Sequence, residues 1–130
     1  MIADTSFLID LLMKKEEAVK KAEKLEKENK GYSITTPTLY ELWAGVSRSD
    51  ADEKDEILDI IESQIIYGLD EESSLAAGKI QRKLLQQGDR IGHIDALIAG
   101  ITRSNSNKIL TGNVTEFDRV ENLEVEDYHE

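Results

Sequence analysis

Four side chains that could do chemistry lie at predicted strand ends or at the starts of the helices that follow. Three are carboxylates and one is an amide: Asp4, Glu41, Asp95 and Asn113. Three carboxylates meeting at one edge of a sheet repel one another, because two charges about 4 Å apart cost roughly 4 kcal/mol at an effective dielectric constant of 20. A divalent cation removes that repulsion, so the set predicts a cation site.

The chemistry of the available ligands favours a hard ion. The chain has no cysteine, and its only histidines are His93 and His129. Oxygen ligands of this kind suit Mg²⁺ or Mn²⁺ and do not suit zinc. Such ions keep several waters and take further ligands from a phosphate. We therefore expect phosphoryl-transfer chemistry, in which one or two ions activate a water for in-line attack and stabilise the leaving oxygen.

Each of the four positions also has a purely structural explanation. Asp4 precedes a predicted helix and could cap its free N–H groups, and Glu41 stands three residues after Thr38, a capping-box spacing. Asp95 gains stability near a helix N-terminus, although a carboxylate in so apolar a helix is costly without a partner or a metal. Asn113 could be a turn residue in the left-handed conformation. No single position decides between the two explanations.

The hydrophobic pattern predicts the elements that position these residues. Short apolar runs predict strands at residues 1–4, 32–36, 64–69, 108–112 and 123–128. Helical spacing predicts helices at residues 6–14, 14–31, 37–46, 50–63, 71–87 and 92–105, and a short helical turn at 115–120. Thr36 is the expected cap of the third helix, with Pro37 at its first position. The alternation indicates an α/β fold with a parallel sheet covered on both faces, and ligands bind outside the carboxyl ends of such strands.

Composition limits the possible functions. The 130 residues, 39% of them hydrophobic, predict one domain over residues 1–130. The chain lacks an apolar run of membrane-spanning length and a secretory signal, so we expect a soluble cytoplasmic protein. The net charge of −11 argues against a nonspecific coat on nucleic acid, which rests on neutralising phosphates with Lys and Arg. Binding RNA would need a local basic rim, a bound cation or a basic partner.

Four stretches resemble a known family in their order and spacing. They are MIADTSFLIDLL, TPTLYELWAG, GHIDALIAGIT and ILTGNVTEFDRVENLEV. Over essentially the whole chain they resemble the PIN-domain ribonucleases of the VapC toxin type. The resemblance implies a PIN-like fold with a five-stranded parallel sheet flanked by helices in three layers, and a Mg²⁺- or Mn²⁺-dependent endoribonuclease. It also implies a homodimer and a VapB-like antitoxin, which would block the acidic site with an Arg or Lys.

The resemblance assigns roles to individual residues. The family's catalytic positions fall on Asp4, Glu41, Asp95 and Asn113, and its metal ligands fall on the three carboxylates. Asn113 departs from the fully acidic form of the family, because an amide coordinates without charge and cannot act as a base. With an amide in place of a carboxylate at residue 113, the sequence gives less support for a tightly bound second metal ion.

Supporting residues follow from the same resemblance. Thr5 or Ser6 would lie near the metal-bound oxygens, or one of them would cap the first helix. Thr111 is either near the site or only a strand-end residue. Glu116 would supply charge through water, or would cap the short helical turn, which is the interpretation we favour.

Bases for RNA contact are scattered along the chain. The candidates are Arg48, Lys79, Arg82, Lys83, Arg90 and Arg103. His93 stands two residues before Asp95, so on a helix its side chain points about 200° away. We therefore expect His93 at the surface or at an RNA edge, and not as a catalytic base.

Three alternative functions stay open at the level of sequence. A housekeeping RNA-processing PIN nuclease is disfavoured by the short chain without an added zinc or RNA-binding module. A catalytically weak PIN-like binding module is suggested only by Asn113. A phosphatase or receiver-type α/β domain is disfavoured because the chain has neither a DxDx[TV] pattern nor paired acids at the end of the first strand.

Overall fold

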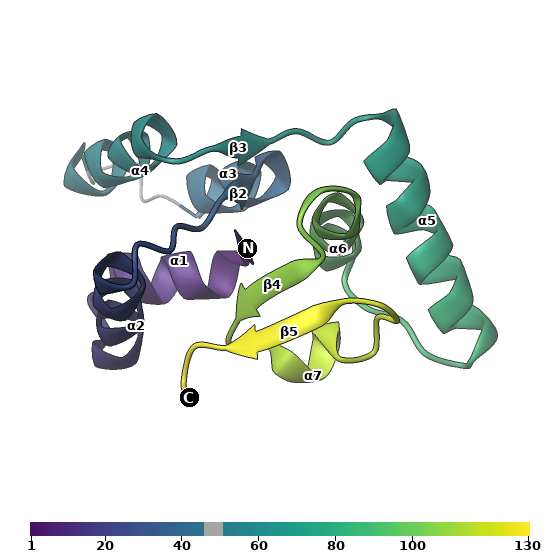
Figure 1. Ribbon diagram of the computed structural model, residues 1–130. Helices are drawn as coiled ribbons and strands as arrows, with labels where there is room; N and C mark the ends of the chain where they lie inside the picture. Colours follow the sequence, from purple (N-terminus) through teal and green to yellow (C-terminus); the bar gives the residue numbers. More distant parts are fainter. Residues whose placement is uncertain (46–50) are drawn as a thin grey trace.

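A five-stranded parallel sheet organises the molecule. The computed structural model describes residues 1–45 and 51–130 (Figure 1). Within these residues the strands are β1 (Ile2–Ala3), β2 (Ile34–Thr35), β3 (Ile66–Tyr67), β4 (Lys108–Thr111) and β5 (Glu124–Asp127). β1, β4 and β5 pair in parallel, and β2 pairs in parallel with β3.

A parallel bridge between Ile2 and Ser33 joins the two groups of strands. The Ala3 N–H donates to the Ser33 carbonyl at 2.8 Å, and the Ser33 N–H donates to the Met1 carbonyl at 2.9 Å. The strand order is therefore β3–β2–β1–β4–β5, which confirms the predicted five-stranded parallel sheet.

Helices lie between the strands as the hydrophobic spacing predicts. They are α1 (Thr5–Leu12), α2 (Glu16–Lys27), α3 (Thr36–Ala44), α4 (Ala51–Ser63), α5 (Glu71–Gln86), α6 (His93–Asn105) and α7 (Val114–Phe117). The predicted end of the third helix at residue 46 and the predicted start of the fourth at residue 50 lie outside the described residues. None of the helices in the described ranges is long and apolar enough to span a membrane.

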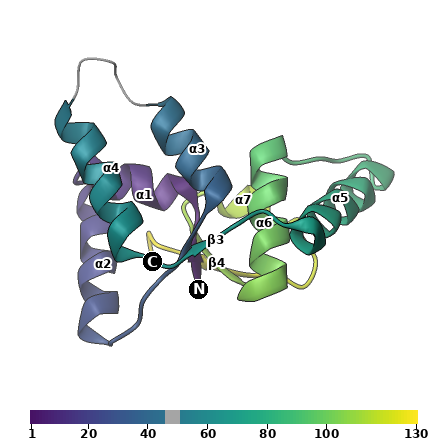
Figure 2. The same cartoon turned by 90° about the horizontal axis from the view of Figure 1, so that it is seen from above.

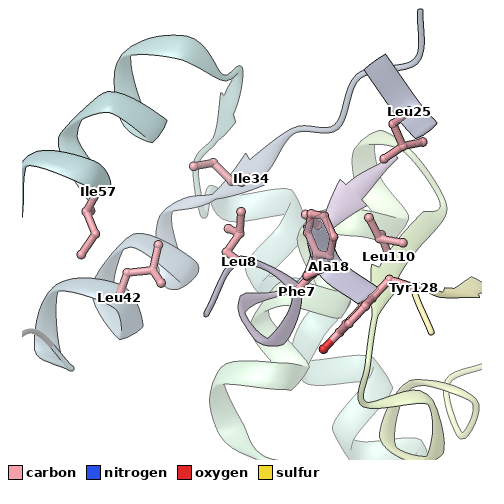
Figure 3. Packing of buried hydrophobic residues seen from close by; sticks show 10 residues of the cluster. Phe7, Leu8, Ala18, Leu25, Ile34, Leu42, Ile57, Leu110 and Tyr128 are labelled. Carbon is pink, nitrogen blue, oxygen red and sulfur yellow. The ribbon is translucent and has the colours of Figure 1, made fainter. Parts of the chain in front are cut away.

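Two apolar cores separate the helices into layers on opposite faces of the sheet. Successive strand residues point to opposite faces, and β4 shows the consequence. Leu110 packs in a core with Phe7, Leu8, Ile34, Leu42 and Ile57 (Figure 3), while Ile109 packs in the other core with residues of α5, α6 and α7. Figure 2 shows α1 to α4 gathered on one side and α5 and α6 on the other. The molecule thus has three layers.

The cap of α3 differs from the predicted one. The N-cap is Thr35, whose extended backbone starts the helix and whose side chain accepts a hydrogen bond from the Thr38 N–H at 3.3 Å. The prediction of Thr36 as the cap is therefore wrong. Thr36 is the first helical residue, and its hydroxyl accepts from the Leu69 N–H at 3.1 Å. Pro37 takes the second position, which it tolerates because the N–H groups of the first turn are free anyway.

The contact between α5 and α6 requires a glycine. A Cβ on Gly100 would lie 2.5 Å from the Ser73 carbonyl oxygen and 2.7 Å from the Ala77 Cβ, whereas a Cβ on Gly78 of α5 would meet no atom within 4 Å. Gly100→Ala should lower the free energy of unfolding by about 1–3 kcal/mol through overpacking. Gly78→Ala should raise it by about 0.5–1 kcal/mol through helix propensity. Urea denaturation followed by circular dichroism measures both, and equal effects of the two substitutions would contradict this packing.

Candidate active site

Asp4 is a buried carboxylate directly after β1. Its backbone N–H donates to the Leu110 carbonyl of β4 at 2.8 Å, and its side chain is only 3% exposed. Asp4 Oδ2 accepts hydrogen bonds from Ser6 Oγ and Thr111 Oγ1, both at 2.9 Å. Asp4 Oδ1 is buried and has no hydrogen-bond partner among the described residues. One oxygen of the carboxylate is thus satisfied and the other is not.

Burial raises the pKa of Asp4 above its usual value, because a buried carboxylate loses its hydration. Hydrogen bonds from the Thr111 and Ser6 hydroxyls act in the opposite direction. Asp4 occupies the N-cap position of α1, yet its side chain makes no capping hydrogen bond. The capping explanation of Asp4 therefore fails, and the buried oxygen requires another compensation, either a proton or a cation.

The chain after β4 closes around Asp4. The Gly112 N–H donates to Ser6 Oγ at 3.1 Å, and the Asn113 N–H donates to Thr111 Oγ1 at 2.8 Å. Gly112 is required here, because a Cβ would lie 2.8 Å from the Tyr128 ring. Ser6 and Thr111 are thus tied to the Asp4 carboxylate and to this loop at once.

Asn113 lies at the start of α7 without the left-handed backbone of a turn residue. Its φ is −100°, so the left-handed turn explanation is wrong. It occupies the N-cap position of α7, but its side chain makes no capping hydrogen bond. The amide is therefore not used in capping the start of the helix.

A chain of threonine hydroxyls holds Glu41. Thr5 Oγ1 donates to Glu41 Oε1 at 2.6 Å and lies 3.0 Å from Thr38 Oγ1. The Thr35 hydroxyl donates to Thr38 Oγ1 at 3.2 Å. A hydroxyl has one O–H to donate. If the Thr5 hydroxyl donates its hydrogen bond to the Glu41 carboxylate, the Thr38 hydroxyl donates its own to Thr5 Oγ1. The protons then point along the chain toward Glu41, the only charged member.

Two capping predictions fail because these hydroxyls have other partners. Glu41 bonds to Thr5 and does not form a capping box with Thr38. Thr5 and Ser6 are the first two residues of α1 and do not cap it. Thr35 and Thr38 were not predicted as members of the site, and the signal that points to them is the run of threonines before and inside the helix that carries Glu41.

Asp95 lies in the first turn of α6 and is partly buried. Burial is the largest cause that raises its pKa to about 7, and the charges of Asp4, Glu41 and Glu116 raise it further. The structure therefore brings Asp4, Glu41 and Glu116 within electrostatic range of Asp95. A Cβ on Gly92 would lie 3.4 Å from Asp95 Oδ2, so the backbone before α6 approaches this carboxylate closely.

Glu116 is not a cap. It stands inside α7, after the N-cap Asn113, and its Oε1 lies 3.5 Å from Arg119 Nη1. The capping role that the sequence favoured for Glu116 is therefore wrong. Its charge instead acts on Asp95.

The donor set can be compared with what a divalent ion requires. In the described ranges, no group of three His, Asp or Glu side chains is close enough to form a ready-made metal cage. Mg²⁺ usually needs less than that, because it binds through one or two carboxylates and keeps waters in its remaining positions. The buried, unpartnered Asp4 Oδ1 and the acids that raise the pKa of Asp95 fit such an ion.

The predicted RNA-contacting bases divide into groups. Lys79, Arg82, Lys83 and Arg103 line one groove. Arg90 is outside this groove, although its carbonyl accepts a hydrogen bond from Arg119 Nη1 at 3.1 Å. His93 is exposed, as expected, and Arg48 lies outside the described residues. Arg119, which was not among the predicted bases, also lines the groove.

Comparisons with known proteins agree on one family. The model of the PIN domain matches residues 1–123. The chain is 28% identical to the tRNA(fMet)-specific endonuclease VapC of Salmonella typhimurium over 96% of this chain and 95% of that protein. It is 32% identical to the ribonuclease VapC2 of Rickettsia felis over 78% of this chain and 77% of that protein. The crystal structure of DNA-bound VapBC from Salmonella typhimurium superposes with a TM-score of 0.87, at 25% identity, over 98% of this chain and 96% of that chain.

The raised pKa of Asp95 has a consequence for metal-free stability. A carboxyl with a pKa of about 7 in the folded state and about 3.9 in the unfolded state favours folding when protonated. This stability is fully present below about pH 4 and is lost as the pH rises to about 7. Asp95→Asn should therefore be more stable than the wild type above pH 7 in EDTA, by about 1–2 kcal/mol after allowance for solvent screening of a partly exposed group.

Urea denaturation from pH 4 to pH 8 measures this difference. The matched control is Asp59→Asn on the exposed side of α4, which should keep the wild-type profile. A fall in stability of Asp95→Asn above pH 7 would contradict the unfavourable burial of this charge and its repulsion by the neighbouring acids.

Proposed function

The chain belongs to the PIN domain family as a homologue of VapC ribonucleases, and from this premise we propose that it is a Mg²⁺- or Mn²⁺-dependent endoribonuclease that hydrolyses RNA phosphodiester bonds. We infer that it is the toxin of a toxin–antitoxin pair and acts in the cytoplasm. The observation that carries the metal site is Asp4 Oδ1, a buried carboxylate oxygen without a partner among the described residues. Family membership also sets aside the phosphatase and receiver alternatives.

In this proposal, the acidic side chains divide the work by their environments. Asp4 Oδ1 and Asp95 would hold the ion, which would supply Lewis-acid stabilisation of the phosphate and a more acidic water. Asp95, with a pKa of about 7 in the ion-free protein, would ionise when a cation is near. Thr5 fixes Glu41 Oε1 and leaves Oε2 as the atom that can accept a proton from the attacking water. Asn113 would contribute an uncharged oxygen.

The apolar surface beside Glu41 supports an antitoxin contact. A groove of about 250 Å³ between α1, α3 and α4 is lined by Glu41 and by apolar residues that include Ile9, Met13 and Leu42. Ile9 is 42% exposed and Met13 is 64% exposed. A peptide with apolar residues for the groove and an Arg or Lys for the carboxylates would fit this surface. We propose this as the binding site of a VapB-like antitoxin.

The homodimer implied by the family resemblance stays a prediction. A second groove, of about 470 Å³, lies between α5 and α6 and is lined by Leu85, Ala96 and Leu97 among others. Leu85 is 58% exposed, and Leu75 of the same helix is 60% exposed. These side chains offer the apolar surface that a second copy would need.

Cleavage assays test the proposed function directly. The wild type should cleave RNA with Mg²⁺ or Mn²⁺ and should lose this activity in EDTA. Asp4→Asn and Asp95→Asn should each lower kcat by at least about 100-fold, because each removes a charged ligand. A tRNA is a reasonable first substrate, since the Salmonella typhimurium relative is a tRNA(fMet)-specific endonuclease.

The control for these variants is Asp59→Asn, which should cleave like the wild type, and near-ultraviolet circular dichroism should show that all variants are folded. An active Asp95→Asn protein would overturn the metal-site assignment. Wild-type protein that binds RNA without cleaving it under any of these conditions would support the weak binding module suggested by Asn113.

Asn113 allows a test of the fourth position of the site. Asn113→Asp adds a negative charge where the fully acidic form of the family has one, so Mn²⁺ should bind about tenfold more tightly. Isothermal titration calorimetry measures the affinity. Asn29→Asp, just past the end of α2, adds the same charge elsewhere and should leave the affinity unchanged. Equal affinities of wild type and Asn113→Asp for Mn²⁺ would place residue 113 outside the metal site.

A further inference from the structure

Five cations line one groove on an otherwise acidic molecule. The groove has a volume of about 330 Å³ and lies between α5, the end of α6 and the segment before β5. Its cations are Lys79, Arg82, Lys83, Arg103 and Arg119, five of the 16 Lys and Arg residues in a chain with a net charge of −11. Figure 1 shows α5 at the outer edge of the molecule.

Helical spacing explains how α5 contributes three of these side chains. Residues three and four apart share one face of a helix, so Lys79, Arg82 and Lys83 point the same way. The floor beneath them is apolar and includes Ile80 and Leu84, both buried. The charges are therefore held on a rigid element and not on a loop.

Most of this positive charge is not neutralised within the chain. Lys83 pairs with Glu121, and Arg119 lies 3.3 Å from Asp89 and 3.5 Å from Glu116. Lys79, Arg82 and Arg103 are all exposed, and in the described part of the chain they form no ion pair. Three unpaired cations on one surface favour an anionic partner.

A second lysine-rich hollow shows the contrast. It has a volume of about 390 Å³ and lies beside α2 and the sheet edge. There Lys21 lies 2.7 Å from Glu126, Lys108 lies 3.0 Å from the same carboxylate, and Lys30 lies 3.4 Å from Glu28. Most of its lysines are paired with neighbouring carboxylates, so this hollow lacks the unpaired positive charge of the groove on α5.

Arg119 connects the groove to the candidate active site. Its guanidinium lies 3.5 Å from the carboxylate of Glu116 on α7, the helix that begins after Asn113. Arg119 also lines the groove with the cations of α5 and α6, so the groove extends to the helix that follows Asn113. Three of the five groove cations are arginines, whose planar fork matches phosphate oxygens.

We propose that this cationic groove binds the RNA backbone beside the cleavage site and holds the part of the substrate that extends past the acidic centre. The inference rests on the ribonuclease function proposed above and names a substrate-binding surface for it. It explains how a chain with a strong negative charge engages RNA, because the strand contacts a local basic surface.

Fluorescence anisotropy with a labelled single-stranded RNA tests the groove without cleavage. In the Asp95→Asn background, the groove variant carries Lys79→Gln, Arg82→Gln and Arg103→Gln, and the control carries Lys20→Gln, Lys24→Gln and Lys27→Gln on α2. Both remove three positive charges. The slope of log affinity against log salt should become smaller by about 2 in the groove variant, since each phosphate contact in single strands contributes about 0.7, and should stay unchanged in the control.

Steady-state cleavage separates this proposal from the proposed function. In the otherwise wild-type chain, the groove variant should raise KM for a long RNA with little change in kcat, and should leave cleavage of an RNA short enough to fill only the acidic site unaffected. Absence of cleavage by the wild type would overturn the proposed function. The anisotropy experiment would still show whether the groove cations bind RNA. Equal losses in groove and control variants, or none in the groove variant, would overturn the groove proposal. So would a polyglutamate peptide that binds as tightly as RNA and loses affinity in the same variant, since it would indicate an acidic protein partner.

Discussion

The buried carboxylate of Asp4 is the constraint around which this end of the sheet is built. A carboxylate that is 3% exposed has lost its hydration and must recover the cost from its surroundings. Ser6 and Thr111 satisfy one oxygen, and through the Gly112 and Asn113 N–H groups the same two hydroxyls hold the loop after β4. The second oxygen has no such support within the described residues. The fold holds Asp4 Oδ2 with two hydrogen bonds and leaves Asp4 Oδ1 without a partner among the described residues. This arrangement fits a cation bound to Oδ1.

The strand order explains why charges from distant parts of the chain meet at this point. β1 lies between β2 and β4, so its carboxyl end has the helix after β2 on one side and the loop after β4 on the other. The helix after β2, α3, carries Glu41, and the loop after β4 carries Asn113. The core that contains α6 brings Asp95 to the same edge, and rigid packing on both faces of the sheet prevents the acids from moving apart. Burial and the repulsion from these acids together raise the pKa of Asp95, and a bound cation would offset both effects.

Sequence patterns predicted which acidic residues meet at the carboxyl edge of the sheet. They did not predict which of several possible partners a side chain contacts. The meeting of Asp4, Glu41 and Asp95 could be predicted because parallel strands bring their carboxyl ends to one edge, and the role of these residues as metal ligands stays a prediction. The threonine chain from Thr35 to Glu41 could not, because a hydroxyl can cap a helix or reach across to another element, and only the packed structure decides. The same ambiguity misplaced the cap of α3 and the role of Glu116. The shared groove of Lys79 and Arg103 also escaped prediction, since it depends on how α5 packs on α6.

The central claim is that Asp4 Oδ1 is a ligand of a divalent cation. Anomalous diffraction from crystals of the wild-type protein equilibrated with Mn²⁺ tests it most directly, because it locates the ion without relying on activity. We predict an anomalous peak about 2.1 Å from Asp4 Oδ1, with the Asp95 carboxylate bound directly or through a water. Saturation of the crystal with Mn²⁺ without an ion in contact with Asp4 Oδ1 would contradict the account and would leave a buried proton as the compensation for this carboxylate.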